Sequence, residues 1–481
     1  MLDKRQFYID GHWVDPVAGR DLEVIDPSTE EACAVISLGG RADSDAAVAA
    51  ARAALPGFMA TPPAERKALV ERILAVYSRR NDEMGAAISL EMGAPIDMAK
   101  SSQSPSGTWH IENFLRAFDQ IEFEAPLSAR SPEDRIIREA VGVCALITPW
   151  NWPMNQVTLK VIPALLAGCT MVLKPSEIAP LSSMLFAEIL DEAGVPPGVF
   201  NLVNGDGPGV GTDLSGHPDV DMVSFTGSTR AGIAISKNAA ETLKHIHLEL
   251  GGKGANLVFA DADDKAVMRG VRHCFNNTGQ SCNAPTRMLV ERSIYDKAVE
   301  IAIETAAKTR VASAHETGNH IGPVVSQAQF DKIQGMIQKG IDEGARLVAG
   351  GLGRPDGLNR GYFVRPTVFA DVNNDMTIAR EEIFGPVLSI IPFEDEADAL
   401  RIANDTVYGL TNYVQSQDGA RRNRLARRLR SGMVEMNGKS RGRGSPFGGM
   451  KASGRGREGG VFGIEDFLEV KAVSGWSADD A

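Results

Sequence analysis

The feature that most constrains the fold of this chain is a regular alternation of short apolar runs and helical segments that starts near Val141. Apolar runs lie at residues 143–147, 170–173, 200–203 and 222–226, and segments with helical spacing fill residues 155–166, 181–193 and 229–240. Strands separated by helices of this length are joined by crossovers, which build a parallel sheet covered on both faces. Such sheets bind ligands beyond the carboxyl ends of their strands.

The same alternation begins again after Leu250. Apolar runs lie at residues 256–259 and 287–290, and helices are predicted at residues 264–276 and 295–308. This second series predicts a second α/β domain that starts near Gly251. By contrast, residues 119–138 show no helical period and include two prolines, which favours an exposed hairpin or arm.

The charge of the chain is unevenly distributed. The 481 residues carry a formal net charge of −12, yet residues 419–457 hold ten arginines, two lysines and one glutamate, so this basic segment is +11 and the remainder is −23. The overall composition is that of a globular protein, and the acidic balance argues against a nucleic-acid binder. Within residues 421–430, Leu425 and Leu429 share one helical stripe, which is typical of a solvated helix.

The cysteines and the apolar stretches bear on the compartment. The five cysteines are sparse and odd in number, with no CxxC pattern, so we expect reduced thiols in a cytoplasmic protein and no metal site. The first residues, MLDKRQFYIDGHWVD, lack the apolar core of a secretion signal. The longest apolar stretch, residues 161–173, is shorter than the ~20 residues of a membrane span, so we expect no membrane association.

Two glycine-bearing segments raise the question of a dinucleotide site. A GxGxxG match at residues 454–459 does not follow a strand, which argues against the nucleotide fingerprint. The turn at Gly227 and Ser228 does follow a predicted strand and opens a helix. Free N–H groups at a helix start bind anions. The local sequence favours such a site and an ordinary capped turn equally.

Cys282 lies in a different setting from the other four cysteines. Its surroundings, NTGQSCNAP at residues 277–285, form a polar loop rather than an apolar run. A thiol in such a loop can be exposed and positioned, as a nucleophile requires. The ordinary alternative is a small buried side chain without a chemical role.

Seven motifs that follow one another along the chain carry a family resemblance. They are TPWNWP at 148–153, LKPSE at 173–177, FTGST at 225–229, LELGGK at 248–253, GQSC at 279–282, EEIFGPV at 381–387 and SPFGG at 445–449. With these motifs the chain resembles the aldehyde dehydrogenase superfamily, of the non-acylating, NAD(P)-dependent type, over nearly its whole length.

The resemblance implies four catalytic roles. Cys282 is expected to be the nucleophile, and Glu249 the general base that activates water against a thioester. Asn151 is expected to donate its amide to the oxyanion, together with the backbone N–H of Cys282. Lys160 is expected to belong to a proton relay. Taken singly, each side chain has an ordinary structural alternative, but the shared order with Cys282 favours catalysis for Asn151 and Glu249.

The resemblance also implies a dinucleotide site. Lys174 and Glu177 are expected to hold the adenosine ribose, and Glu382 and Phe384 the nicotinamide ribose. Glu177 favours NAD, because a carboxylate accepts from a 2′-hydroxyl but repels a 2′-phosphate. The full expected set comprises Thr148, Pro149, Trp150, Lys174, Ser176, Glu177, Gly207, Gly211, Phe225, Gly227, Ser228, Leu250, Glu382 and Phe384.

The substrate region departs from the family pattern. Trp152 is a bulky choice after Asn151, and small polar residues, Ser281 and Asn283, flank the nucleophile. The segment that reaches the substrate entrance in relatives is unusually basic here, with Lys439, Arg441 and Arg443. We hypothesise that these cations steer an acidic aldehyde such as a semialdehyde. The alternative is that they are solvated or pair with an adjacent subunit.

The resemblance implies a fold and an activity. We expect two parallel-sheet α/β domains plus a small β oligomerisation arm: residues 1–117 and 141–250 as the dinucleotide-binding domain, 251–450 as the catalytic domain, and 118–140 with 465–481 as the arm. We expect a homodimer or homotetramer. The expected reaction is NAD-dependent oxidation of an aldehyde to an acid. An NADP-preferring or CoA-acylating enzyme and a non-catalytic dinucleotide-binding relative are the alternatives.

Overall fold

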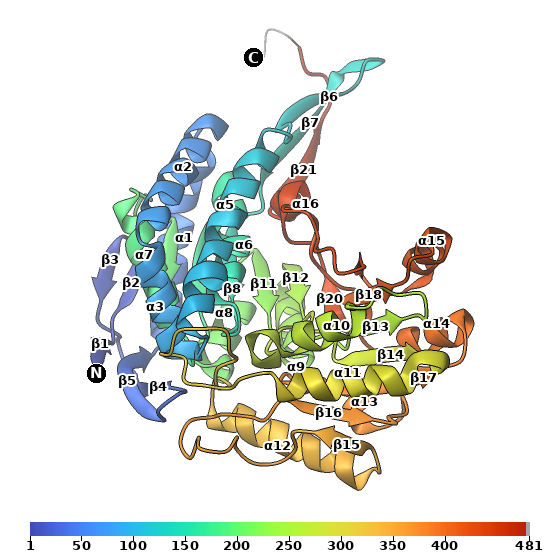
Figure 1. The fold of residues 1–481 in the computed structure, drawn as a ribbon. Helices are drawn as coiled ribbons and strands as arrows, with labels where there is room; N and C mark the ends of the chain where they lie inside the picture. The colour runs from blue at the N-terminus through green and yellow to red at the C-terminus, as the bar shows by residue number, and fades with distance from the viewer. Residues whose placement is uncertain (478–481) are drawn as a thin grey trace.

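The computed structural model describes residues 1–477, so residues 478–481 of the expected arm lie outside the described part. Two large sheets, each with helices packed on it, form the body of the molecule, and a narrow β arm projects from one end (Figure 1). This architecture confirms the predicted fold class. The first sheet holds the N-terminal half of the chain and the second most of the C-terminal half.

The first sheet is parallel at its centre. Its central strands are β8 (Val143–Ile147), β9 (Thr170–Lys174), β10 (Phe200–Leu202), β11 (Met222–Thr226) and β12 (His245–Glu249), in the order β12-β11-β8-β9-β10. Antiparallel strands extend both edges: β20 (Gly454–Arg455) beside β12, and β2 (Phe7–Ile9) with β3 (His12–Val14) beside β10. The short strand β20 therefore brings the end of the chain back to the N-terminal half.

Helices cover both faces of this sheet because alternate strand residues point to opposite sides. The helices of this half are α1 (Arg41–Met59), α2 (Pro63–Arg79), α3 (Asn81–Met92), α4 (Ile96–Met98), α5 (Ser104–Phe118), α6 (Pro153–Ala167), α7 (Leu181–Glu192), α8 (Thr212–Gly216) and α9 (Thr229–Ala239). In β8, Cys144 and Leu146 share a core with residues of α2, α5, α6 and α7, whereas Val143 and Ala145 share a core with residues of α1, α8 and α9.

The second sheet has the order β15-β16-β17-β14-β13-β18-β19, parallel except for β15. Its strands are β13 (Ala255–Val258), β14 (Arg287–Glu291), β15 (Arg346–Ala349), β16 (Thr367–Ala370), β17 (Val387–Phe393), β18 (Thr411–Gln415) and β19 (Met433–Met436). Helices α10 (Ala266–Phe275) and α11 (Tyr295–Ala307) cover one face, and α12 (Gln327–Asp342), α13 (Thr377–Arg380), α14 (Glu396–Asn404) and α15 (Gly419–Arg428) the other.

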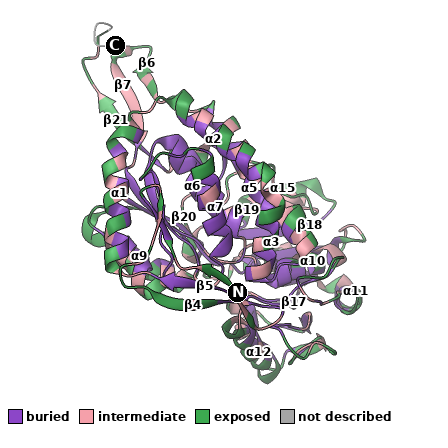
Figure 2. Ribbon diagram, turned by 90° about the vertical axis from the view of Figure 1, so that its left-hand side faces the viewer, coloured by how far each residue is buried: buried purple, intermediate pink, exposed green. Residues whose placement is uncertain are grey.

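The predicted hairpin forms the arm. Strands β6 (Glu124–Ser128) and β7 (Ser131–Ala140) pair with each other, and β21 (Leu468–Val473), which follows helix α16 (Gly460–Glu465), pairs with β7. The arm is exposed or half-buried over most of its length, in contrast to the buried sheets of the body (Figure 2). Because β6 and β21 lie at the two edges of this sheet, each has one side that pairs with no other strand of residues 1–477.

Several elements have no counterpart among the predicted segments. Strands β1 (Leu2–Lys4), β4 (Arg20–Asp26) and β5 (Glu31–Leu38) form a separate small sheet. Tighter or wider helical turns occur as the π-helices Ala99–Gln103 and Gly207–Gly211 and the 3₁₀-helices Ala240–Thr242, Asn276–Gly279, Arg292–Ile294 and Lys451–Ser453.

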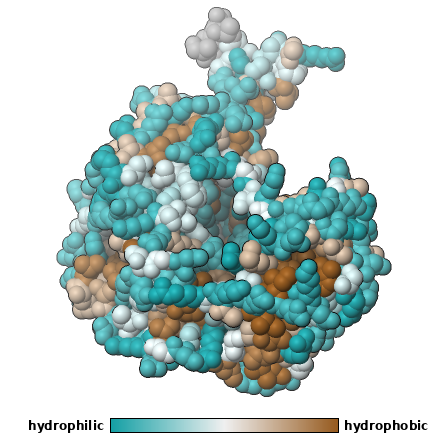
Figure 3. All heavy atoms as spheres, viewed as in Figure 1, coloured by the Kyte–Doolittle hydropathy of each residue, from teal (hydrophilic) through white to brown (hydrophobic). Residues whose placement is uncertain are grey.

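Within residues 1–477, no helix is both long and apolar enough to cross a membrane. On the face seen in Figure 3, hydrophobic groups form separate patches among hydrophilic ones. The basic segment is divided structurally: α15 uses Leu425 as its buried contact, whereas residues 437–443 form a loop.

Candidate active site

A cavity of about 200 Å³ lies where both halves of the chain meet. The first sheet contributes the segments that follow the carboxyl ends of β8, β11 and β12, as expected for parallel sheets. The second half contributes residues 277–285 (the cysteine loop, which carries Cys282), helix α12 and the segment after α13. The lining residues are Pro149, Trp150, Asn151, Gln156, Thr226, Gly227, Ser228, Glu249, Leu250, Gly251, Cys282, Gln329, Lys332, Glu382 and Phe384.

The loop before Cys282 has an unusual backbone. Asn277, Thr278 and Gly279 all have positive φ, at 51°, 56° and 72°. Left-handed non-glycine residues each cost about 1–3 kcal/mol and persist only where their surroundings hold them. Here Gln103 donates to Asn277 Oδ1 at 3.1 Å, and Asn277 donates to the Asn151 carbonyl at 2.9 Å. The turn at residues 277–279 therefore fixes the cysteine loop against the segment that contains Asn151.

The Cys282 thiol is half-buried at the cavity. Burial raises its pKa, and the carboxyl groups of Glu382 and Glu249 raise it further, while Arg441 opposes them. The residues of this chain by themselves thus favour the protonated thiol at neutral pH. A positive charge or a hydrogen-bond donor added to the cavity would favour the thiolate.

The side-chain amide of Asn151 points at the cysteine loop. Its Nδ2 donates to the Gln280 carbonyl at 3.0 Å, and the side chain is 4% exposed. A carboxamide has two N–H groups, so the second one remains for a substrate oxygen beside Cys282. This arrangement suits an uncharged donor to a developing oxyanion.

Glu249 is a buried carboxyl group on the cavity wall. Neither of its oxygens has a hydrogen-bond partner among the described residues. Burial raises its pKa to about 7, with His247 lowering it and Glu458 raising it. A carboxyl group with a pKa near neutrality suits a general base.

Lys160 does not reach the cavity lining. Its Nζ donates to Glu458 at 2.6 Å and to Ser224 at 3.2 Å, with the lysine fully buried. The nearest link to the site is electrostatic, because the charge of Lys160 lowers the pKa of Glu249. The predicted relay role of Lys160 stays a prediction.

The residues expected to hold adenosine gather at the end of β9. Lys174 donates to Glu177 at 3.1 Å and to the Pro175 carbonyl, and Gly211 packs against the Lys174 side chain. Gly207 opens the π-helix that ends at Gly211. Others of this group also lie outside the cavity lining: Thr148, whose N–H donates to the Lys174 carbonyl, and the buried Ser176 and Phe225.

The predicted anion site at the start of α9 has suitable geometry. Ser228 caps the helix by accepting from the Ala231 N–H at 3.2 Å. A Cβ at Gly227 would lie 2.4 Å from the Phe225 ring, so only glycine fits this turn. The Thr226 hydroxyl beside it is buried without a hydrogen-bond partner in the described chain, which suits a polar ligand.

The residues expected to hold the nicotinamide ribose face the cavity from the second half. Glu382 accepts from the Gly252 N–H at 2.9 Å, and burial raises its pKa. Phe384, with φ of 61°, packs edge-on against Trp150 at 5.4 Å between ring centroids. The two halves of the chain therefore meet through this aromatic pair, next to Leu250 on the lining.

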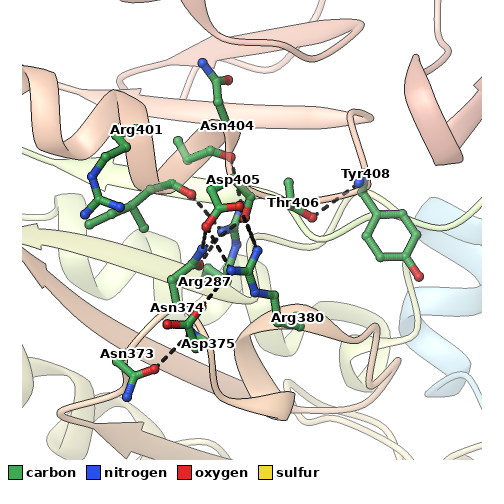
Figure 4. A network of polar contacts seen from close by, with 12 residues as sticks. Arg287, Asn373, Asn374, Asp375, Arg380, Arg401, Asn404, Asp405, Thr406 and Tyr408 are labelled. Carbon is green, nitrogen blue, oxygen red and sulfur yellow. Dashed lines mark hydrogen bonds and ion pairs between the residues drawn. The ribbon is translucent and has the colours of Figure 1, made fainter.

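A polar network around Arg287, the first residue of β14, holds the segment that carries Glu382 (Figure 4). The fully buried Arg287 donates to the Lys253 carbonyl at 3.1 Å and to Asn374 at 2.9 Å. Arg380, just before Glu382, binds Asp405 and Asp375. The network joins Lys253, in the loop that follows Glu249, to the segment that carries Glu382.

The expected substrate residues do not all lie together. Trp152 donates its indole N–H to Ser281 at 2.8 Å, and the Asn283 carbonyl accepts from Tyr413 at 2.6 Å. Arg441 donates Nε to Glu435 at 3.0 Å and stacks on Phe447. Its charge reaches Cys282, whereas Arg443 stacks on Trp109 of α5 and Lys439 is exposed.

Several residues of the site were not predicted from the sequence. Gln156, Gln329 and Lys332 line the cavity, and Gln103 and Gln280 hold the cysteine loop. The GxGxxG glycines have a steric role instead, since a Cβ at Gly454 would lie 2.0 Å from the Leu248 carbonyl. The sequence did contain a signal for one further residue near the site. His247 precedes Glu249 by two residues on a strand, so both side chains lie on one face of the sheet.

The chain is similar to several known proteins over nearly its whole length. The family model described as "Aldehyde dehydrogenase family" matches residues 13–473. A 3-succinoylsemialdehyde-pyridine dehydrogenase from Pseudomonas sp is 52% identical, covering 99% of both chains. The crystal structure of an aldehyde dehydrogenase from Bartonella henselae is 63% identical, with a TM-score of 0.98, over 99% of this chain and 100% of that one. A Pseudomonas syringae aldehyde dehydrogenase C mutant, crystallised with NAD+ and octanal, is 48% identical, with a TM-score of 0.96, over 98% and 97%.

Proposed function

Because the chain belongs to the aldehyde dehydrogenase family, it is an aldehyde-oxidising enzyme, and we propose that it converts an aldehyde to a carboxylic acid with NAD through an intermediate on Cys282. The observation that carries this proposal is the single cavity lined by Cys282, Asn151 and Glu249. A nucleophile, an oxyanion donor and a base within one cavity are the groups that acyl transfer to water requires.

In the first half of the proposed reaction, the Cys282 thiolate attacks the aldehyde carbon. The free amide N–H of Asn151 and the backbone N–H of Cys282 donate to the oxygen that becomes negative. Removing one such donor typically costs about 10²–10³ in rate. Bound NAD would supply the hydride acceptor at this point. The thiohemiacetal carbon held on Cys282 would lose a hydride, which would leave a thioester on Cys282.

In the second half, water hydrolyses the thioester. Glu249 removes a proton from the water, the oxygen attacks the carbonyl carbon, and the carbon–sulfur bond breaks to release the acid and the Cys282 thiolate. A carboxylate is required for this step, and the site supplies one that titrates near pH 7. Glu249 therefore favours water over coenzyme A as the acyl acceptor.

The residues present fit a dinucleotide. The start of α9 offers N–H groups for a phosphate, the unpaired Thr226 hydroxyl faces the same cavity, and Glu177 beside Lys174 offers a carboxylate to a ribose hydroxyl. The NAD+ complex of the Pseudomonas syringae relative supports the choice of cofactor. The residues proposed for the two ribose groups are Lys174 and Glu177 at one end and Glu382 and Phe384 at the other.

For the substrate, we propose a semialdehyde. The name of the Pseudomonas sp relative supports this class. In the present chain, Arg441 is held by Glu435 through Nε, and its terminal nitrogens make no hydrogen bond to any described residue. These N–H groups suit an acceptor oxygen at the far end of the aldehyde.

The reaction is tested by NADH formation over a panel of aldehydes. We expect NADH and free acid, at rates that coenzyme A does not change, and no NADH from Cys282→Ser. The matched control is Cys274→Ser, a buried cysteine in α10 outside the cavity. NADH formation by Cys282→Ser, or acyl-CoA as the product, would contradict the proposal.

The substrate class needs its own comparison. The wild type should prefer a semialdehyde over a neutral aldehyde of equal length, and Arg441→Ala should reduce that preference at least tenfold. Arg427→Ala serves as the control, because Arg427 is exposed on α15 in the same basic segment. Unchanged selectivity in Arg441→Ala would exclude Arg441 as the determinant.

The proposed place of action is the cytoplasm. All five cysteines are free thiols in the structure, which supports a reducing compartment.

A further inference from the structure

A buried histidine and an aspartate from the C-terminal segment lie behind the proposed base. His247 and Glu249 share one face of β12, and His247 Nε2 is 3.6 Å from Glu249 Oε1. On its other side, His247 Nδ1 contacts the Asp466 carboxylate. His247 and Glu249 are each 2% exposed, whereas the Asp466 side chain is 23% exposed.

We propose that the His247–Asp466 pair is a positioning device for Glu249: Asp466 holds His247 as an imidazolium, and the imidazolium keeps the base in its carboxylate form. The inference rests on the proposed function, because it assigns a role to residues behind the base of that reaction. It does not require His247 to touch substrate or cofactor.

The charges around His247 support this assignment. Burial opposes a charge on the ring, yet the contacts with the Asp466 and Glu249 carboxyl groups and the charge of Glu458 raise the pKa of His247 to about 9. The imidazolium is therefore the main form at neutral pH. It faces a Glu249 carboxyl group that no other described residue hydrogen-bonds.

Other charged groups near Glu249 oppose each other. Glu458, from the segment after β20, raises the pKa of Glu249, and Lys160, from α6, lowers it. Those two are already joined by a 2.6 Å ion pair, so much of each charge is cancelled. Arg457 donates to the carbonyls of Gly449 and Gly456. Across the cavity, Cys282 is neutral when protonated, and His247 is left as the positive group closest to Glu249.

The consequence for the reaction is a wider working range of pH. An isolated buried glutamic acid is protonated around neutrality and cannot accept a proton from water. An adjacent imidazolium stabilises the carboxylate, so hydrolysis of the thioester continues at lower pH. Removing the positive charge should raise the pH at which Glu249 becomes a base.

The decisive experiment titrates Glu249 directly, in the whole protein without substrate. The infrared C=O band of its protonated carboxyl group is assigned by its loss in Glu249→Gln. In His247→Gln, the midpoint of this band should move up by at least one pH unit relative to wild type, and Asp466→Asn should move it in the same direction. His245→Gln is the control, since His245 lies on the same strand with an exposed side chain. An unmoved midpoint in both variants would overturn the inference.

Kinetics supply a second measurement on an accepted aldehyde. Turnover of His247→Gln should fall at least tenfold at pH 6.5 and approach the wild-type value at pH 9, with the initial burst of NADH retained. A loss by the same factor at every pH would indicate a merely structural role and would also overturn the inference. Failure of the proposed function is distinct, since it appears as no NADH from any aldehyde and leaves the infrared titration unaffected.

Discussion

At the reactive centre, two side chains that line the same cavity must each lose a proton, and the negative charge of one hinders the ionisation of the other. Cys282 must lose a proton to attack, while burial and the carboxyl groups of Glu382 and Glu249 hold its pKa high. Glu249 must also lose a proton, and burial raises its pKa to about 7. The two groups repel each other as anions, so the charge that permits one step opposes the other.

Reactivity of Cys282 should therefore depend on the cofactor. Because the raised pKa keeps the thiol protonated at pH 7.5, iodoacetamide should modify it slowly in the free protein. NAD should accelerate modification at least tenfold, since a nearby cation favours the thiolate. Mass spectrometry of the peptide that contains residue 282 measures the rate, with half-buried Cys33 as the internal control. Equal rates with and without NAD would refute the electrostatic argument.

The cofactor choice is a second prediction at this scale. The Glu177 carboxylate should repel a 2′-phosphate, so kcat/KM should be at least tenfold higher with NAD than with NADP. Glu177→Ala should narrow that ratio, whereas Glu192→Ala, an exposed carboxylate at the end of α7, should not. Equal kcat/KM values for the two cofactors in the wild type would show that Glu177 does not discriminate.

At the scale of elements, the left-handed turn before Cys282 stands out, because it places a strained backbone where the nucleophile must be held. Gly279 is essential to it for a steric reason: a Cβ there would lie 2.1 Å from the Gly385 carbonyl. The turn thus brings the cysteine loop against the segment after α13, which also carries Glu382. Strain of this kind is common where a functional group must be held in one position.

Gly279→Ala should destabilise the protein by at least about 1–3 kcal/mol, the usual cost of such a conformation, and should abolish turnover. Thermal unfolding measures the first effect and NADH formation the second. Gly335→Ala is the control: this glycine lies inside α12 with open space around it, so alanine should stabilise slightly. A wild-type melting temperature in Gly279→Ala would show that the turn can relax.

The sequence predicted those strands and helices well whose apolar residues recur regularly within one short segment. The first parallel sheet and its helices follow the predicted segments closely, because buried parallel strands read as short apolar runs. The sheet of β1, β4 and β5 was missed because β1 and β4 are largely exposed, and because β5, although it carries the apolar run ACAVI at residues 32–36, lies outside the alternation of strands and helices. In the site, motif order predicted Cys282 and Glu249, which line one cavity. Asp466 was not predicted because nothing local links it to His247 across more than 200 residues.

For the whole molecule, the arm is the feature that a single chain leaves incomplete. Strand β21 contains no proline and has one edge that pairs with no other described strand, and its Val470 is 65% exposed. Open edges of this kind pair readily with another chain. We therefore propose that residues 118–140 and β21 join copies of the chain into a homodimer or homotetramer.

Val470→Glu should weaken this assembly. The new carboxylate would lie opposite Arg138 in β7, so the arm itself should remain paired while its apolar surface is lost. Sedimentation velocity should show a dimer or tetramer for the wild type and smaller species for the variant. Leu243→Glu changes a 92% exposed leucine outside the arm and should assemble normally. A monomeric wild type would contradict the proposal.

The return of the chain end to the first sheet has a consequence for biosynthesis. During translation, Asn151 and Cys282 leave the ribosome well before β20, Glu458 and Asp466 are synthesised. Until that last segment arrives, Lys160 lacks its carboxylate partner and His247 lacks Asp466. A chain interrupted before residue 454 would carry the cysteine loop without the charges that surround the base. The polar surroundings of Glu249 are thus completed only when the segment from β20 to Asp466 has joined the first sheet.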